Sequence, residues 1–419
     1  MNINTTNLRS LGSLAGIALL TLTLGLSSGL AHTKEFRYRY VSLDQAKLPP
    51  GFNLFQPIAI NDSGLIYGVA FDESSTQYVA VYKRGVVTIL SAGLPNAVNE
   101  GGTVGGSVLD DPVNFTRQAA LFRGNKVKLI PRQSSEEVSS TVDDLNDSGA
   151  ALVTTRDNSF NFASLLYKKG QTTPLDFGPT ITSPFFLHIN NETTISGTTS
   201  ASGNFRGFRF DTRTSKTTQL NPLSTETDSR AFDINNNGKV LGDSFIEGST
   251  QRIGVWGRKG EFKTYFVEGT PEFPTISNQM VFNDKNLIVI TFVASPVSEE
   301  GASYLVPKPG VRLNLADLVK NMPPDQNLFT ILDINNKGDM VGLSVKDFTI
   351  QDAFLLERYD EKEHAYSASS FVDVQVPSGM SNRRRHISPA VEAKLRKYIH
   401  QLKSDSAMPQ DIQESLMWK

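Results

Sequence analysis

The sequence predicts an all-β fold, a seven-bladed β-propeller. Three observations lead to this prediction: an asparagine turn recurs seven times, several short β-prone runs accompany each copy, and a lone strand precedes the first copy. A period of roughly 45 residues indicates a solenoid, an array or a propeller. Four short antiparallel strands in each of seven units favour the propeller. A pair of β-sandwiches or a β-solenoid is the competing interpretation.

The chain begins with a segment, residues 1–31, that has the features of a secretory signal peptide. Arg9 is its only charged residue, and an apolar stretch follows over residues 14–26. Gly29 and Ala31 supply small residues at the −3 and −1 positions of a cleavage site. We therefore expect cleavage after Ala31 and a secreted or periplasmic bacterial protein, with an uncleaved N-terminal anchor as the alternative.

The repeated turn consists of an asparagine that follows an aliphatic or aromatic residue. The seven copies are Asn61, Asn99, Asn146, Asn190, Asn235, Asn283 and Asn335. Successive copies are 38, 47, 44, 45, 48 and 52 residues apart. Asn, Asp and Gly tolerate positive φ, so a segment such as residues 60–64, Ile-Asn-Asp-Ser-Gly, can connect antiparallel strands tightly. We interpret the seven asparagines as structural repeat turns.

Four β-prone runs accompany the turn in a complete unit. In the first unit they are residues 57–60, 65–69, 78–82 and 86–90, and each is rich in β-branched or aromatic residues and bounded by turn formers. These are strand and hairpin signals. The propeller is expected to span residues 37–360 as seven repeats of about 45 residues.

The last unit lacks an obvious fourth run, whereas a lone run over residues 38–43 precedes the first turn. We predict that this N-terminal strand closes the last blade. Such closure removes the open sheet edges that invite aggregation.

The best copy of the repeat, residues 334–342, reads Ile-Asn-Asn-Lys-Gly-Asp-Met-Val-Gly, and residues 353–356 read Ala-Phe-Leu-Leu. These segments resemble the bacterial extracellular repeat family called HAF, over roughly residues 37–360. No copy has His before the Ala-Phe pair, which departs from the family's signature. The resemblance implies a secreted propeller-like scaffold and supplies no catalytic residues.

The C-terminal part changes in character after the repeats. We interpret residues 361–387 as a linker and residues 388–419 as a short amphipathic helical tail. Ser388 and Pro389 resemble an N-cap and a first-turn proline. The tail either packs on the propeller or docks on a membrane or partner. Its mixture of acidic and basic residues weakens the membrane version.

Composition excludes several classes of function. The chain has no cysteine, which rules out thiol catalysis, iron–sulfur clusters and Cys-ligated zinc. Its formal net charge of −2 gives no overall attraction to nucleic acid or membrane. We expect a monomer with no nucleic-acid partner.

Few residues suggest a chemical site. Asp233, Asn235 and Asn237 have the alternate spacing of a calcium loop, but no copy carries the bidentate Glu that completes such a loop, so turn chemistry is the favoured reading and no cofactor is expected. No pair among the five histidines has metal-ligand spacing, and no Gly-x-Ser-x-Gly elbow is present. No catalytic residue is assigned.

Two functions follow. The first is an exported, non-catalytic propeller that binds a protein or glycan or serves as a structural scaffold at the cell envelope. The second is an exported hydrolase or lyase with its site in the propeller channel. Acidic and His residues that converge at one end of the channel would favour the enzyme, and an apolar or aromatic outer patch would favour the binding module.

Overall fold

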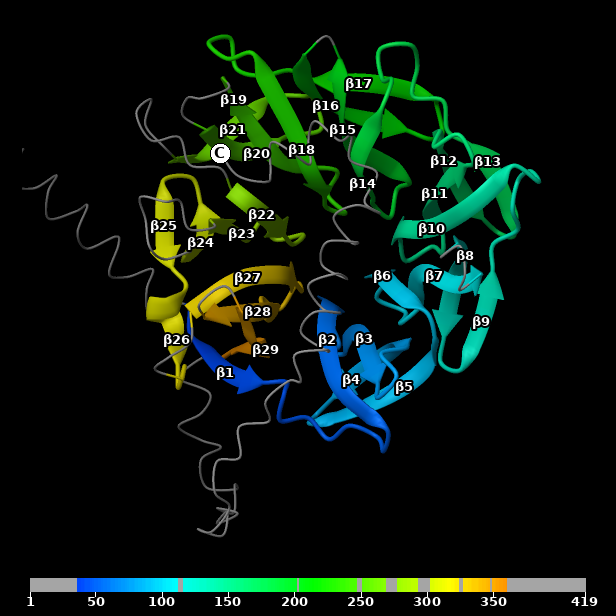
Figure 1. Ribbon diagram of the computed structural model, residues 1–419. Coiled ribbons are helices and arrows are strands. Elements are labelled where there is room, and N and C mark those ends of the chain that lie inside the picture. The colour runs from blue at the N-terminus through cyan, green and yellow to red at the C-terminus, as the bar shows by residue number, and fades with distance from the viewer. Residues whose placement is uncertain are drawn as a thin grey trace, which may run out of the picture.

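The computed structural model describes residues 36–111, 116–201, 203–246, 251–268, 277–292, 302–323, 327–346 and 349–359. These residues form seven sheets arranged as blades around a central axis (Figure 1). The predicted all-β, seven-bladed propeller is confirmed. The signal peptide expected over residues 1–31 and the linker and helical tail expected over residues 361–419 lie outside the described residues. No helix within the described ranges has the length and apolar character that crossing a membrane requires.

Blades 1 to 3 each contain four strands in chain order from the axis outward. Blade 1 consists of β2 (Phe52–Ile60), β3 (Ile66–Asp72), β4 (Gln77–Lys83) and β5 (Val86–Ala92). Blade 2 consists of β6 (Leu94–Val98), β7 (Val104–Asp111), β8 (Thr116–Arg123) and β9 (Lys126–Leu129). Blade 3 consists of β10 (Glu137–Leu145), β11 (Ala151–Asp157), β12 (Phe162–Lys168) and β13 (Gln171–Pro174).

Blades 4 to 6 repeat this order. Blade 4 consists of β14 (Pro184–Ile189), β15 (Thr194–Ala201), β16 (Asn204–Asp211) and β17 (Lys216–Leu220). Blade 5 consists of β18 (Asp228–Ile234), β19 (Val240–Phe245), β20 (Gln251–Trp256) and β21 (Phe262–Glu268). Blade 6 consists of β22 (Ser277–Phe282), β23 (Ile288–Phe292), β24 (Ala302–Lys308) and β25 (Val311–Asn314).

Blade 7 joins the two ends of the ring. It contains β27 (Asn327–Ile334), β28 (Met340–Lys346), β29 (Thr349–Arg358) and the N-terminal β1 (Tyr38–Ser42). β1 pairs antiparallel with β29, with Tyr38 opposite Arg358 and Ser42 opposite Phe354. The predicted closure by the N-terminal strand is confirmed.

A fifth strand in blade 7 was not predicted. After the short 3-10 helix η1 (Ala316–Leu318), β26 (Val319–Lys320) pairs parallel with the outer edge of β1. The connection between blades 6 and 7 thus covers the edge that β1 would otherwise expose.

Burial falls from the middle strands toward the outer edge. Every residue of β23 is buried, because this strand lies between two neighbouring blades, whereas every residue of β9 is exposed. The hydrophobic core is divided into clusters that lie between adjacent blades. This arrangement explains why the repeats read as short runs of β-branched and aromatic residues.

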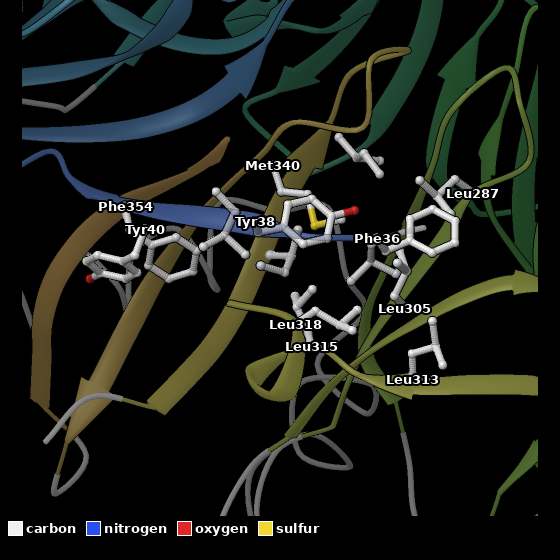
Figure 2. Close-up of a cluster of buried hydrophobic side chains, with 14 residues drawn as sticks. Phe36, Tyr38, Tyr40, Leu287, Leu305, Leu313, Leu315, Leu318, Met340 and Phe354 are labelled. Atoms are coloured by element: carbon white, nitrogen blue, oxygen red, sulfur yellow. The ribbon is translucent and has the colours of Figure 1, made fainter. Parts of the chain in front are cut away.

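The largest of these clusters holds β1 in place. Phe36 and Tyr38 pack with Leu287 and Leu305 from blade 6 and with Phe354 from β29 (Figure 2). Leu43, just beyond β1, joins a second cluster between blades 7 and 1. Burial of one such side chain contributes about 1.5–3 kcal/mol, so β1 is a principal part of the closure.

Candidate functional site

The innermost strands of the seven blades enclose a central channel with a cavity of about 500 Å³. The first strand of each blade runs along this channel and ends at the repeated asparagine turn. All seven turns therefore lie at one end of the channel, which we call the Asn mouth.

Each repeat asparagine is buried, and six of the seven have two tasks, which Asn146 illustrates; for Asn61 the side-chain hydrogen bonds lie within its own turn. Asn146 Oδ1 accepts hydrogen bonds from the N–H of Ala150 at 3.0 Å and from Ser148 Oγ at 2.8 Å, which fixes the turn. Its Nδ2 donates to the backbone carbonyl of Asn190 in the next blade at 2.9 Å. The side chain thus caps its own turn and ties two blades together.

This blade-to-blade donation follows one direction around the ring. It runs from Asn99 to Asn146, Asn146 to Asn190, Asn190 to Asn235, Asn235 to Asn283, Asn283 to Asn335 and Asn335 to Asn61. The interpretation of these residues as structural turns therefore agrees with their hydrogen bonds, and the structure adds the link between blades.

The residue after each asparagine forms a second ring at the Asn mouth. Its backbone N–H donates to a side-chain oxygen of the corresponding residue in the next blade, at 2.6–2.9 Å in all seven junctions. The seven members are Asp62, Glu100, Asp147, Asn191, Asn236, Asp284 and Asn336. Four of them are carboxylates, and burial together with repulsion from Asp62 raises the pKa of Glu100. The mouth is therefore acidic.

A β-bulge inside the channel explains how more side chains reach its wall. In five blades the pairing of the first two strands skips the residue three positions before the repeat asparagine, as at Ile58, Asn96 and Phe232. A bulge turns two successive residues of one strand toward the same side. Residues two and three positions before an asparagine can then both line the channel.

The glycine in the second strand of several repeats is required by this bulge. A Cβ on Gly68 would lie 1.9 Å from the carbonyl oxygen of Gln56, and one on Gly106 would lie 2.0 Å from that of Leu94. The first strand approaches the second so closely that only glycine fits. The last Gly of the repeat motif, which lies in the second strand, therefore indicates a bulged channel wall.

The position two residues before the asparagine carries the charges inside the channel. Three blades place Asp144, Asp233 and Asp333 there, and a fourth places His188. His188 Nδ1 lies 3.6 Å from Asp144 Oδ2 and 3.9 Å from Asp233 Oδ1. One imidazole thus stands between two carboxylates from the neighbouring blades.

These neighbours determine the charge of the histidine. Burial alone would lower the pKa of His188. The hydrogen bond with Asp144 and the field of Asp233 outweigh burial and raise this pKa to about 9. His188 is therefore an imidazolium at neutral pH. Burial raises the pKa of Asp233 to about 6, and the His188 charge opposes this shift.

Asp333 lies on the other side of the ring and has no histidine partner among the described residues. Its Oδ2 accepts the N–H of Ile60 in the next blade at 2.8 Å, and its Oδ1 accepts its neighbour Ile334 N–H at 2.8 Å. Burial is the larger influence and raises the pKa of Asp333 to about 7. Asp143, which does not line the cavity, accepts a hydrogen bond from the Thr154 hydroxyl, and burial raises the pKa of Asp143 to about 6.

Two phenylalanines lie beside the charged residues on the channel wall. The rings of Phe186 and Phe232 have centroids 5.5 Å apart, and both side chains line the cavity. Phe186 has φ +53°, which costs a non-glycine residue on the order of 1–3 kcal/mol. The guanidinium of Arg230 stacks over Phe232 at 5.2 Å and pairs with Asp243 at 2.5 Å.

The structure separates the three calcium candidates. Asp233 turns into the channel beside His188, whereas Asn235 Oδ1 accepts the backbone N–H groups of Asn237 and Lys239 at 3.1 Å. Asn237 Nδ2 donates to the Asp284 carbonyl at 2.6 Å. Within the described ranges, no group of three His, Cys, Asp or Glu residues has the geometry to hold a metal ion.

Sequence reasoning did not assign His188 or Asp144 to a site, because only local spacing was considered. The signal was present in the repeat itself, since Asp144, His188, Asp233 and Asp333 all precede their repeat asparagine by two residues. Equivalent positions in a propeller lie at equal depth in the channel, so a shared offset indicates a shared location.

Comparisons with known proteins support the fold. No family model matches the sequence, and no curated protein matches it. Among solved structures, the β-propeller domain of the Trilobed protease from Pyrococcus furiosus, which has an open velcro topology, gives a TM-score of 0.50 at 9% identity, over 73% of this chain and 96% of that one.

Two further solved structures are more distant in shape. YCF48 bound to a D1 peptide has a TM-score of 0.44 at 12% identity, over 77% of this chain and 96% of that one. TolB from Acinetobacter baumannii has a TM-score of 0.40 at 12% identity, over 71% and 78%.

Proposed function

We propose that this protein is an exported propeller scaffold that binds a partner in its central channel through a cationic group of that partner. One observation carries the proposal. The described residues that line the channel include seven carboxylates and one histidine but neither lysine nor arginine.

The physical argument rests on confinement. Charges of one sign in a cleft with low-dielectric walls focus the field and raise the local concentration of oppositely charged ligands. An ammonium or guanidinium group entering from the Asn mouth meets the four carboxylates of the second ring first and Asp333 further in. The faces of Phe186 and Phe232 add a surface that attracts cations.

The same charges favour one of the two partner classes expected from the sequence. A neutral glycan has no group that would gain from this field, whereas a protein segment offers lysine and arginine side chains. We therefore infer a basic peptide segment as the partner. Export rests on the signal segment alone, and an intact mass that begins at His32 would support it, whereas a mature chain that still begins at Met1 would contradict it.

Peptide binding provides the test of the channel. A fluorescent peptide rich in lysine and arginine should bind the protein, with affinity that falls as salt rises, and its glutamate-rich counterpart should not. At pH 8, above the raised pKa of Asp333, Asp333→Asn should weaken binding of the basic peptide several-fold, because it removes one of the charges deepest in the channel.

Glu73→Gln is the matched control, since Glu73 is exposed in blade 1 outside the channel and the variant changes the net charge equally. Equal affinity for the basic and acidic peptides, or equal losses in Asp333→Asn and Glu73→Gln, would contradict the proposal.

The hydrolase or lyase alternative gains one specific observation, since Asp144, His188 and Asp233 converge near the Asn mouth. An imidazolium beside a carboxylate of pKa about 6 is a possible acid–base pair. However, the described lining residues include no Ser, Thr, Tyr or Lys, which leaves only carboxylates to act as a nucleophile, and His188 is protonated at neutral pH.

Binding therefore explains the channel better than catalysis does. Turnover of peptide or polysaccharide substrates that is abolished in His188→Gln, with the fold retained, would reverse this order. Substrates left unchanged by the wild-type protein would support the binding function.

A further inference from the structure

A second hollow lies outside the channel, between blades 4 and 5, with a volume of about 230 Å³. Its wall includes Glu192 and Gly238 from two of the repeated turns, so it opens beside the Asn mouth. Strands β16 and β17 contribute Arg209 and Lys216, and Arg258 follows β20. The charge of this hollow is opposite to that of the channel.

Positive charge exceeds negative charge among the lining residues. The cations are Arg209, Arg213, Lys216 and Arg258, and the carboxylates are Glu192 and Asp211. Arg258 Nη2 pairs with Glu192 Oε1 at 2.8 Å, and Arg213 Nη2 pairs with Asp211 Oδ2 at 3.2 Å. Arg209 and Lys216 remain, and neither has an ion-pair partner within the part of the chain that the structure describes.

Arg209 is the more informative of the two because it is half-buried. Its Nη1 donates to the carbonyls of Gly238 and Gly257, each at 3.4 Å, and its Nη2 donates to the carbonyl of Arg258. Carbonyl oxygens satisfy N–H groups but do not neutralise the guanidinium charge. Burial, and then repulsion from Arg258, lowers the pKa of Arg209, while the carboxylates of Glu261 and Asp211 oppose this shift.

The guanidinium also retains unused hydrogen-bond donors. It carries five N–H groups in a planar fork, and the three contacts to carbonyl oxygens do not occupy all of them. A planar fork beside an ammonium group matches the geometry of a carboxylate, sulfate or phosphate. Thr218, half-buried in the same wall, offers a hydroxyl donor.

We propose that the hollow between blades 4 and 5 is an oxyanion-binding site, in which Arg209 and Lys216 hold a sulfate, phosphate or carboxylate group. This site is separate from the channel. A protein that bound no oxyanion in this hollow could still bind cations in the channel, and a protein that bound no cation in the channel could still bind an oxyanion here.

Calorimetric titration of the folded protein at low ionic strength tests the site. Sodium sulfate, sodium phosphate and sodium glucuronate are used as separate probes, each against sodium chloride at the same ionic strength. Binding of sulfate and phosphate alone would assign a tetrahedral oxyanion, and binding of glucuronate alone would assign a carboxylate. No heat beyond that of chloride for any probe would overturn the proposal.

Variants locate the binding. Lys216→Glu should weaken it at least tenfold, and Arg209→Lys, which keeps the charge but removes the planar fork, should weaken it several-fold. Lys126→Glu is the control, because Lys126 is an exposed strand residue in blade 2 and the charge change is the same. Equal losses in Lys216→Glu and Lys126→Glu would show non-specific attraction and contradict the proposal. Arg209→Lys decides the matter if Lys216→Glu does not fold.

Discussion

Two tyrosines of β1 provide a sharp test of how the ring is closed. Tyr38 and Tyr40 lie on the same face of the strand, and both belong to the cluster between blades 6 and 7. Their hydroxyls differ. Tyr40 Oη donates to the buried carboxylate of Asp352 at 2.7 Å, whereas the buried Tyr38 Oη has no hydrogen-bond partner among the residues that the structure describes.

The two Tyr→Phe substitutions should therefore act in opposite directions. Tyr40→Phe removes a hydrogen bond to a charged group and should lower the free energy of unfolding by about 1.5–3 kcal/mol. Tyr38→Phe removes a hydroxyl that was dehydrated without compensation, and it should raise that free energy by about 1 kcal/mol. In a domain of this size, 1 kcal/mol corresponds to roughly 2–4 °C in Tm.

Thermal unfolding followed by circular dichroism measures both effects, and each variant serves as the control for the other because both remove one oxygen atom from the same strand. Tyr40→Phe should melt several degrees below the wild type, and Tyr38→Phe should melt slightly above it. A Tyr38→Phe variant that is as destabilised as Tyr40→Phe would refute the reasoning, because it would mean that a buried water satisfies the Tyr38 hydroxyl.

Three further predictions follow. Deleting residues 32–45 removes β1 and should unfold the ring, because the stabilisation lost with its buried side chains amounts to at least several kcal/mol. A deletion variant that melts at the wild-type temperature would contradict the closure. Stability should fall as pH rises from about 4 to 9. Asp44 and Asp333 have pKa values raised to about 7, so they bind protons more tightly in the folded state than in the unfolded state, and the stability that this supplies is lost between about pH 4 and 7. The pKa of His188 is raised to about 9, so the stability that it supplies is lost between about pH 6.5 and 9. Urea denaturation at pH 5, 7 and 9 checks the sign, with Asp333→Asn expected to flatten the acidic part, and a rise in stability from pH 5 to 7 would show the assignment to be wrong. Asn146→Ala leaves the buried Ala150 N–H and Asn190 carbonyl without that side chain and should cost about 2–4 kcal/mol in chemical denaturation; a loss below about 0.5 kcal/mol would mean that water replaces both bonds.

The ring itself was accessible from the sequence because its signals are local. An asparagine that caps a turn and a glycine that allows positive φ act over four or five residues, so each copy can be recognised alone. The closure followed from counting strands, since the last unit lacked one and the N-terminal run supplied it. Strand β26 was not expected, because a two-residue strand leaves no periodic pattern.

The content of the channel was not accessible in the same way. Asp144, His188 and Asp233 are 44 and 45 residues apart in the chain, and only the geometry of the ring brings them together. Their approach also depends on the bulge, which shifts the inward-facing register by one residue. Simple alternation of strand residues does not reveal such a shift.

The meeting of the two ends at blade 7 determines how the molecule can be attached to anything else. The N–H of Tyr359 donates to the carbonyl of Arg37 at 3.0 Å, so the described chain enters and leaves the ring at adjacent points. An attachment joined to the ring beside Arg37 or beside Tyr359 therefore has the same anchor position. Blades 3 and 4 lie opposite that anchor in the ring, so the hollow between blades 4 and 5 lies away from it. Surface-based binding measurements should avoid coupling through lysine side chains, which include Lys216.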